Sequence, residues 1–179
     1  NNATMNIYPG EKTGESIVVF DNAPSKRWNG YFSYDNKGQD STGRNQAVLG
    51  VGIDNIFGLN DLLNLSYNRS LPLEANRQDS FSSSIFYAMP LGYHTLSLNA
   101  SRSEYDSTLQ TQFNQLHSSG ETNTYTGRVD SLLYRGFNNQ LRANIGLTHK
   151  DTAAFLEDVK LDVSSRKLSV LDIGLSYSD

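Results

Sequence analysis

The sequence predicts an all-β fold, in which the chain supplies about eight strands of an antiparallel transmembrane β-barrel. Three observations point to this fold. Apolar and polar residues alternate through one stretch after another, and the connections between these stretches are short and long in turn. The composition is also rich in aromatic residues, with 10 Tyr and 8 Phe against 4 Pro, and aromatic residues favour strands.

The bulk composition excludes several classes of protein. The 179 residues carry a net charge of −4, so no basic surface for nucleic acid is predicted. The absence of cysteine excludes a disulfide framework and a thiolate metal site. No run of about 18 apolar residues occurs, so no transmembrane helix is predicted, but a spanning strand needs only about 9 to 11 residues. The mean hydropathy of −0.51 is compatible with such strands, because only one face of each is apolar.

Residues 1–27 are expected to form a unit of their own, and 28–179 the barrel strands. Met5–Tyr8 and Gly14–Phe20 are predicted to pair as a short hairpin around Pro9–Gly10. Asp21–Lys26 is expected to be a linker, since Pro24 disfavours both helix and strand.

Strict alternation marks the strands that follow. Leu141, Ala143 and Ile145, for example, alternate with Arg142 and Asn144, as expected of a strand with two unlike faces. The expected strands lie at about 28–35, 44–55, 61–69, 81–89, 93–102, 123–134, 140–149 and 167–177.

The expected connections alternate in length. The short ones are 56–60, 90–92 and 135–139, and the long polar ones are 36–43, 70–80, 103–122 and 150–166. Short turns on one side and long loops on the other are typical of outer-membrane barrels. Gln110–His117 and Thr152–Val159 are expected to form a turn or two of helix within their loops.

The polar face of the strands suits a wet interior better than an outer surface. It carries Ser, Asn, Gly and Thr with single charges such as Asp54 and Asp172, whereas Lys is nearly absent. Such charges as Arg128, Asp130 and Arg142 either line a channel or bind a plug, or they pair structurally across neighbouring strands. Aromatic residues gather near the strand ends, as in the two girdles of a membrane barrel. They are Trp28, Tyr31, Phe32, Tyr34, Phe57, Tyr67, Phe81, Phe86, Tyr87, Tyr93, Phe137 and Tyr177.

No pattern predicts catalysis, a metal site or a cofactor. The three His lie on separate elements, and Gly50-Val-Gly52 lacks the third glycine and the following helix of a dinucleotide site. Gly50 and Gly52 are interpreted instead as a close strand approach or a strong local curvature. The loop Asp35–Asp40 has the carboxylates of a calcium site, but no Glu closes it at the required position. We therefore expect no enzyme activity.

A family resemblance rests on the order and spacing of several short stretches. They are Ser33-Tyr-Asp-Asn-Lys-Gly38, Thr42-Gly-Arg-Asn-Gln46, Gly58-Leu-Asn-Asp61, Phe155-Leu-Glu-Asp158 and Gly174-Leu-Ser-Tyr177. In this order the chain resembles the TpsB transporters of two-partner secretion, of the haemolysin-activator (ShlB) type. Its first hairpin is similar to the end of the family's second POTRA domain, a periplasmic domain that leads directly into a barrel of about 16 strands.

The resemblance implies part of an outer-membrane pore that exports a large exoprotein: an adhesin, a cytolysin or a contact-dependent inhibition toxin. The expected partners are this exoprotein, outer-membrane lipid and the remainder of the barrel. The residues expected to face lipid are Leu49, Val51, Leu63, Leu65, Ile145, Leu147, Ile173 and Leu175. The residues expected to face the pore are Asp54, Asn64, Ser66, Arg128, Asp130, Arg142 and Asp172.

Two alternatives remain open at the level of sequence. One is a small, self-contained eight-stranded outer-membrane barrel with an adhesin or structural role. The other is a soluble lipocalin-like binder, which would carry its apolar face inside.

Overall fold

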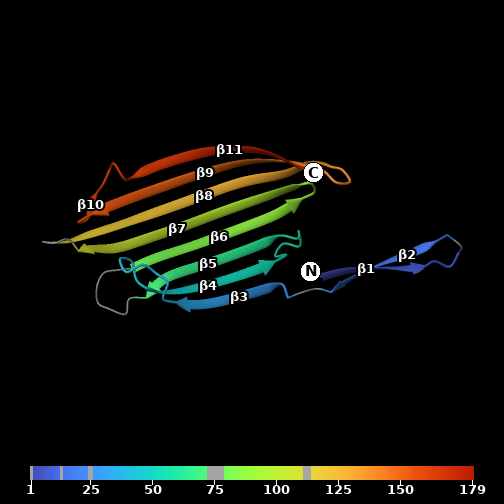
Figure 1. Ribbon diagram of the computed structural model, residues 1–179, viewed down its shortest axis with the longest axis horizontal. Helices are drawn as coiled ribbons and strands as arrows, with labels where there is room; N and C mark the ends of the chain where they lie inside the picture. Colours follow the sequence, from blue (N-terminus) through green and yellow to red (C-terminus); the bar gives the residue numbers. More distant parts are fainter. Residues whose placement is uncertain (1, 13, 24–25, 72–78, 111–113) are drawn as a thin grey trace.

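The computed structural model describes residues 2–12, 14–23, 26–71, 79–110 and 114–179 (Figure 1). Within these ranges the regular elements are all strands, arranged in a separate two-stranded hairpin and one nine-stranded antiparallel sheet. No helix of the described residues is long and apolar enough to cross a membrane. The prediction of an all-β antiparallel fold is confirmed.

The amino-terminal hairpin consists of β1 (Asn2–Pro9) and β2 (Ser16–Ala23). Its turn is closed by the N–H of Gly10, which donates to the carbonyl oxygen of Glu15 at 2.8 Å. The predicted hairpin is thereby confirmed. The expected linker is wrong at its start, because Asp21 still pairs with β1, while residues 24–25 lie outside the described ranges.

The large sheet follows the order of the chain, each strand pairing with the next through β9. Its strands are β3 (Trp28–Asp35), β4 (Asn45–Asp54), β5 (Leu62–Leu71), β6 (Asp79–Leu91), β7 (His94–Gln110), β8 (Gln115–Arg135), β9 (Gln140–Leu156), β10 (Val159–Lys160) and β11 (Arg166–Ser178). Both β10 and β11 pair with β9, so β3 and β11 are the two long edges. A self-contained barrel requires its two edge strands to pair with each other. In the described residues β3 and β11 are not paired, so the sheet is open.

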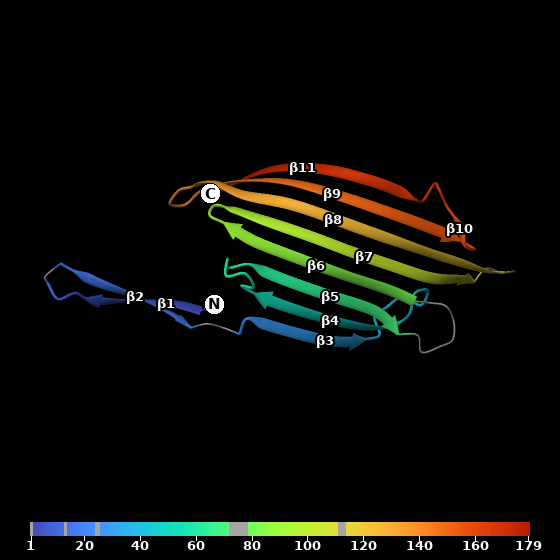
Figure 2. The ribbon, with the colours of Figure 1, turned by 180° about the vertical axis from the view of Figure 1, so that it is seen from behind.

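The two ends of the sheet differ. The turns that join β4 to β5, β6 to β7 and β8 to β9 lie at one end, and the connections of β3 to β4 and of β9 to β11 lie at the other (Figure 1). Figure 2 shows the same arrangement from behind, with the β1–β2 hairpin extending from the short-turn end. The predicted alternation of short and long connections is wrong in part, because only residues 111–114 separate β7 from β8 and 157–165 separate β9 from β11, rather than the expected 103–122 and 150–166.

Strands β7, β8 and β9 are much longer than their apolar alternation predicts. Ser103–Gln110 and Gln115–Thr122 were expected to be loop, yet they continue β7 and β8, and Lys150–Leu156 continues β9. The predicted helical turns are wrong for the same reason: Gln115–His117 lies in β8, and residues 111–113 lie outside the described ranges. The extensions of β7 and β8 are largely polar, and none of the three has a buried apolar side chain among the described residues, so their strand form comes from cross-strand hydrogen bonding.

The sheet has one apolar face that nothing in the described structure covers. No described apolar side chain is buried, and Leu49, Leu147 and Ile173 are 51%, 57% and 75% exposed. A soluble sandwich or barrel would enclose such a face in its core. An apolar face of this kind is the arrangement that a lipid environment stabilises.

Candidate functional site

The candidate site is the polar face of the large sheet, and strand register decides which residues share it. Asp54 on β4 pairs with Leu62 on β5, and side chains two positions apart on a strand point to the same side. Asp54, Asn64 and Ser66 therefore lie on one face. Asn64 in turn pairs with Phe86 on β6, which carries the face across to the next hairpin.

The same register carries this face to the far side of the sheet. Phe86 pairs with Asn99 on β7 and Asn99 with Thr126 on β8, so Arg128 and Asp130 share the face. Arg128 pairs with Gly146 on β9, and Gly146 with Asp172 on β11. Arg142 stands two pleats from Gly146 and has the same orientation. All seven residues predicted to face the pore thus share one face.

The eight apolar residues predicted to face lipid share the opposite face. Val51 pairs with Leu65, and Leu63 connects through Tyr87, Leu98 and Gly127 to Leu147. The remaining positions follow the same register. They are Leu49, Ile145, Ile173 and Leu175.

The polar face has a charged part on β8, β9 and β11. The Nε of Arg128 donates to Oδ2 of Asp130 at 2.9 Å, and Nη2 donates to Oδ1 at 2.9 Å. The carboxylate of Asp172 lies over Gly146, close enough to interact electrostatically with Arg128. Arg142 donates to Oε1 of Gln140 at 3.2 Å. The alternative of pairing across neighbouring strands is not the arrangement of Arg128 and Asp130, which pair along one strand.

The rest of the polar face, apart from single charges such as Asp35, Asp54 and Lys150, is neutral and rich in hydroxyl groups. Ser66 and Ser84 are hydrogen bonded across β5 and β6 at 2.7 Å, and Thr126 and Thr148 across β8 and β9 at 3.2 Å. These hydroxyls satisfy one another, which leaves a small, wettable surface without an activated nucleophile. Asn64 belongs to this neutral part, far along the strand order from Arg128 and Asp172.

Two aromatic residues on the polar face depart from the predicted girdles. Tyr31 pairs with Gly50, and its ring occupies the space that a Cβ at Gly50 would need. Phe86 lies between Asn64 and Asn99 in the register. The girdle prediction is therefore wrong for Tyr31 and Phe86. Gly50, interpreted from sequence as a close approach or a curvature, instead makes room for a side chain from β3.

The other strand aromatics of the predicted girdles share the apolar face. Register places them at both ends of that face, with the short turns supplying three more exposed rings. Those on strands are Trp28, Phe32, Tyr34, Tyr67, Phe81, Tyr87 and Tyr177, and those in turns are Phe57, Tyr93 and Phe137.

One buried carboxylate organises the first short turn. Asp61 is only 2% exposed, and its Oδ1 accepts the N–H of Phe57 at 3.2 Å. Its carbonyl oxygen accepts the N–H of Asn55 at 2.5 Å. Asn55 and Asn60 have φ angles of 58° and 59°, a left-handed conformation that Asn tolerates better than most residues.

The carboxylates of the loop 35–40 are already engaged. An oxygen of Asp35 accepts the N–H of Lys37 at 3.0 Å, and Asp40 is paired with the Arg44 guanidinium. The hydrogen bond from Arg44 is the main cause that lowers the pKa of Asp40 below its usual value. Within the described residues no three His, Cys, Asp or Glu side chains are grouped to hold a metal ion.

Comparison with known proteins identifies relatives along nearly the whole chain. Residues 14–179 match the family model described as haemolysin secretion/activation protein ShlB/FhaC/HecB. The chain is 34% identical to the outer membrane transporter CdiB-2 of Burkholderia pseudomallei, covering 97% of this chain and 30% of the relative. It is 32% identical to the hemolysin transporter protein ShlB of Serratia marcescens, covering 99% of this chain and 32% of the relative.

Among solved structures, the chain is also similar to two proteins that are both named CdiB. CdiB from Escherichia coli matches with a TM-score of 0.86 and 29% identity, covering 99% of this chain and 33% of that chain. CdiB from Acinetobacter baumannii matches in fold with a TM-score of 0.72 at 24% identity, covering 98% of this chain and 34% of that chain. The chain thus spans about a third of the length of these relatives.

Proposed function

Because the chain belongs to the ShlB/FhaC/HecB family of haemolysin secretion/activation proteins, we propose that it forms part of an outer-membrane pore that exports a large partner protein. The observation that carries this proposal is the sorting of side chains between the two faces of the sheet. The seven polar residues predicted to face the pore, Asp172 included, share one face, and the eight apolar residues predicted to face lipid share the other. An aqueous passage on one side and lipid on the other satisfy both faces.

In this proposal the polar face is pore wall. The neutral hydroxyl rows of β5–β9 offer an unfolded polypeptide a wettable surface without strong electrostatic traps. The charged part around Arg128 and Asp172 sets the local field of the passage. The relatives are named as transporters rather than enzymes, and we propose no catalytic role for any residue.

The β1–β2 hairpin is proposed to be the end of a periplasmic POTRA domain, with residues 28–179 as the first barrel strands. Its place at the short-turn end of the sheet supports this division, because short turns of such barrels face the periplasm. The long loops then face the outside of the cell. The free edges β3 and β11 require the remainder of a barrel of about 16 strands, since open edges are not tolerated in lipid.

The exported partner is proposed to be an adhesin, a cytolysin or a contact-dependent inhibition toxin. The names of the relatives favour the last two classes, since two of them are an outer membrane transporter CdiB-2 and a hemolysin transporter. A more distant relative, at 24% identity, is named a heme/hemopexin transporter. Relatives that match this segment are therefore named as transporters of different partners.

Single cysteines in the full-length protein test the assignment of the two faces. Leu65→Cys and Asn64→Cys are adjacent, as are Ile173→Cys and Asp172→Cys, so each pair is internally matched. We expect a lipid-soluble thiol reagent to label positions 65 and 173, and a small charged reagent to label 64 and 172. Because this segment has no native cysteine, it adds no background of its own. The reversed pattern would overturn the proposal.

A further inference from the structure

A belt of charged side chains interrupts the apolar face near the long-loop end of the sheet. Arg69 on β5 connects by register through Phe81 to Glu104 on β7 and Glu121 on β8. One pleat nearer the short turns, Arg102 connects through Asn123 and Asp151 to Lys167 on β11. We call this set the belt. Its members are Arg69, Asp79, Arg102, Glu104, Glu121, Asp151 and Lys167.

The belt is a row of exposed ion pairs of mixed sign. Arg69 Nη2 lies 2.9 Å from Asp79 Oδ2, and Lys167 Nζ lies 2.7 Å from Asp151 Oδ2. Arg102 Nη2 lies 2.5 Å from Glu104 and 3.5 Å from Glu121. The Arg102 side chain remains 52% exposed, so its guanidinium is accessible to a further ligand. Exposed pairs of this kind add little stability, which leaves their position on the lipid side unexplained by folding alone.

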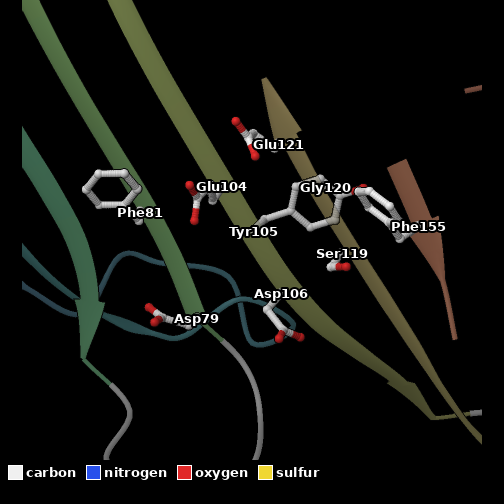
Figure 3. Close-up of a pocket in the computed structure, with 9 residues that line it drawn as sticks. All are labelled: Asp79, Phe81, Glu104, Tyr105, Asp106, Ser119, Gly120, Glu121 and Phe155. Carbon is white, nitrogen blue, oxygen red and sulfur yellow. The ribbon is translucent and has the colours of Figure 1, made fainter. Parts of the chain in front are cut away.

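A pocket of about 350 Å³ opens within the belt (Figure 3). Phe81 and Phe155 stand at its two sides, and the carboxylates of Glu104, Glu121 and Asp106 lie between them. Asp106 is also within 3.2 Å of His117 Nδ1. The pocket therefore combines aromatic walls with hydrogen-bond acceptors, and Arg102 is paired with two of the lining carboxylates, Glu104 and Glu121.

The belt directly adjoins the apolar surface. Along one side of β7 the residues change from Asp106, Glu104 and Arg102 to Ala100 and Leu98 within a single pleat. A molecule bound where Arg102 adjoins Ala100 would place its polar part against the belt and its apolar part against the aliphatic side chains of the apolar face. This arrangement of an apolar surface beside hydrogen-bonding groups matches a lipid that has a large headgroup with many hydrogen-bonding atoms.

We propose that the belt and its pocket hold the headgroup of a phosphorylated glycolipid in the outer leaflet. Arg102 and Arg69 would contact phosphate, for which the guanidinium fork is well suited. The carboxylates of Glu104 and Glu121 accept hydrogen bonds from sugar hydroxyls, while Phe81 and Phe155 pack against the sugar ring. The acyl chains continue along the apolar face. This inference rests on the proposed function for its lipid-facing side and its outward orientation.

Purified full-length protein in detergent, titrated with bisphosphorylated lipid A, provides the test. Native mass spectrometry measures the bound lipid, and the unfolding midpoint is followed on unheated and heated gels. We expect lipid A to remain bound and to raise the midpoint, and Arg102→Gln to weaken its binding about tenfold. Lys37→Gln is the matched control, since it neutralises a cation at the same end of the sheet but outside the belt. Its affinity should equal that of the parent protein.

Phe155→Ala provides a second variant that leaves the ion pairs intact, and it should weaken lipid A binding as well. Phosphatidylglycerol, which has a phosphate but no aminosugar, should bind at least tenfold less tightly. Equal binding of both lipids, or lipid A binding unchanged in both variants, would overturn the inference. If the cysteine pairs still sort to the two faces in that case, the proposed pore wall stands and only the headgroup site fails.

Discussion

At the scale of single residues, the buried carboxylate of Asp61 stabilises the turn between β4 and β5. Asp61 satisfies the backbone of the β4–β5 turn, in which Asn55 and Asn60 adopt positive φ. The Tyr87 hydroxyl also interacts with its carboxylate. A turn of this form positions β5 against β4 and therefore sets the register of the whole polar face.

Replacing Asp61 by Ala is expected to destabilise the full-length protein by about 1–3 kcal/mol, because the N–H of Phe57 loses its acceptor. Asp61→Asn is the matched control, since its side-chain oxygen still accepts that hydrogen bond. The free energy of unfolding is measured by urea titration of the protein in detergent micelles. Equal stability of Asp61→Ala and Asp61→Asn would show that the hydrogen bond does not hold the turn.

At the scale of elements, the long strands separate a spanning part from an exposed part. β8 has 21 residues, whereas about 9 to 11 suffice to span the hydrocarbon region. Beyond the belt, β7 and β8 continue as a largely polar extension, and β9 continues beside them. There the N–H of His117 donates to Oε1 of Glu157 at 2.6 Å, and the N–H of Glu157 donates to the His117 carbonyl oxygen at 2.9 Å. The backbone pairing of this extension is satisfied without lipid.

Shortening the β7–β8 hairpin at its outer end should therefore leave membrane insertion intact. We expect a variant that lacks residues 107–118, with Asp106 joined to its register partner Ser119 by Asn-Gly, to fold and to remain heat-modifiable. A control deletes the same number of residues from the spanning part, 95–100 and 125–130, which pair with each other, so the β7–β8 register is kept. This control should lose insertion, as measured by outer-membrane fractionation. Loss of insertion in both variants would contradict the division.

At the scale of the whole molecule, the sheet is open and its edges decide what it can do. The outward backbone groups of β3 and β11 have no strand partner within the described residues. In hydrocarbon, each unsatisfied backbone group costs several kcal/mol, so such edges must find partners. The proposed pore wall therefore needs further strands before it can close.

We expect the 179-residue chain alone to show no heat-modifiable band in detergent, because it cannot close. Coexpression with the remainder of the full-length protein should restore the band and protect both pieces from added protease. The comparison is made on unheated and heated gels, with the intact full-length protein as the positive control. A compact, heat-modifiable band from the 179 residues alone would instead favour the small self-contained barrel.

Local alternation in the sequence was enough to predict the central part of each strand, its two faces, and the common face of the seven residues predicted to face the pore. This succeeds because the period of two is a property of each strand, and antiparallel pairing preserves it from one strand to the next. The family, too, could be inferred from short stretches such as Gly58-Leu-Asn-Asp61.

Tertiary structure decided what alternation does not encode. The extensions of β7–β9 became strand because their neighbours offered hydrogen-bonding partners. Tyr31 faces Gly50 rather than lipid, since register sets its side, and Arg128 pairs along its own strand with Asp130. The belt and its pocket also emerged only when distant positions such as Arg102 and Lys167 met at one level of the sheet. The physical reason is that register is a long-range property, whereas alternation is local.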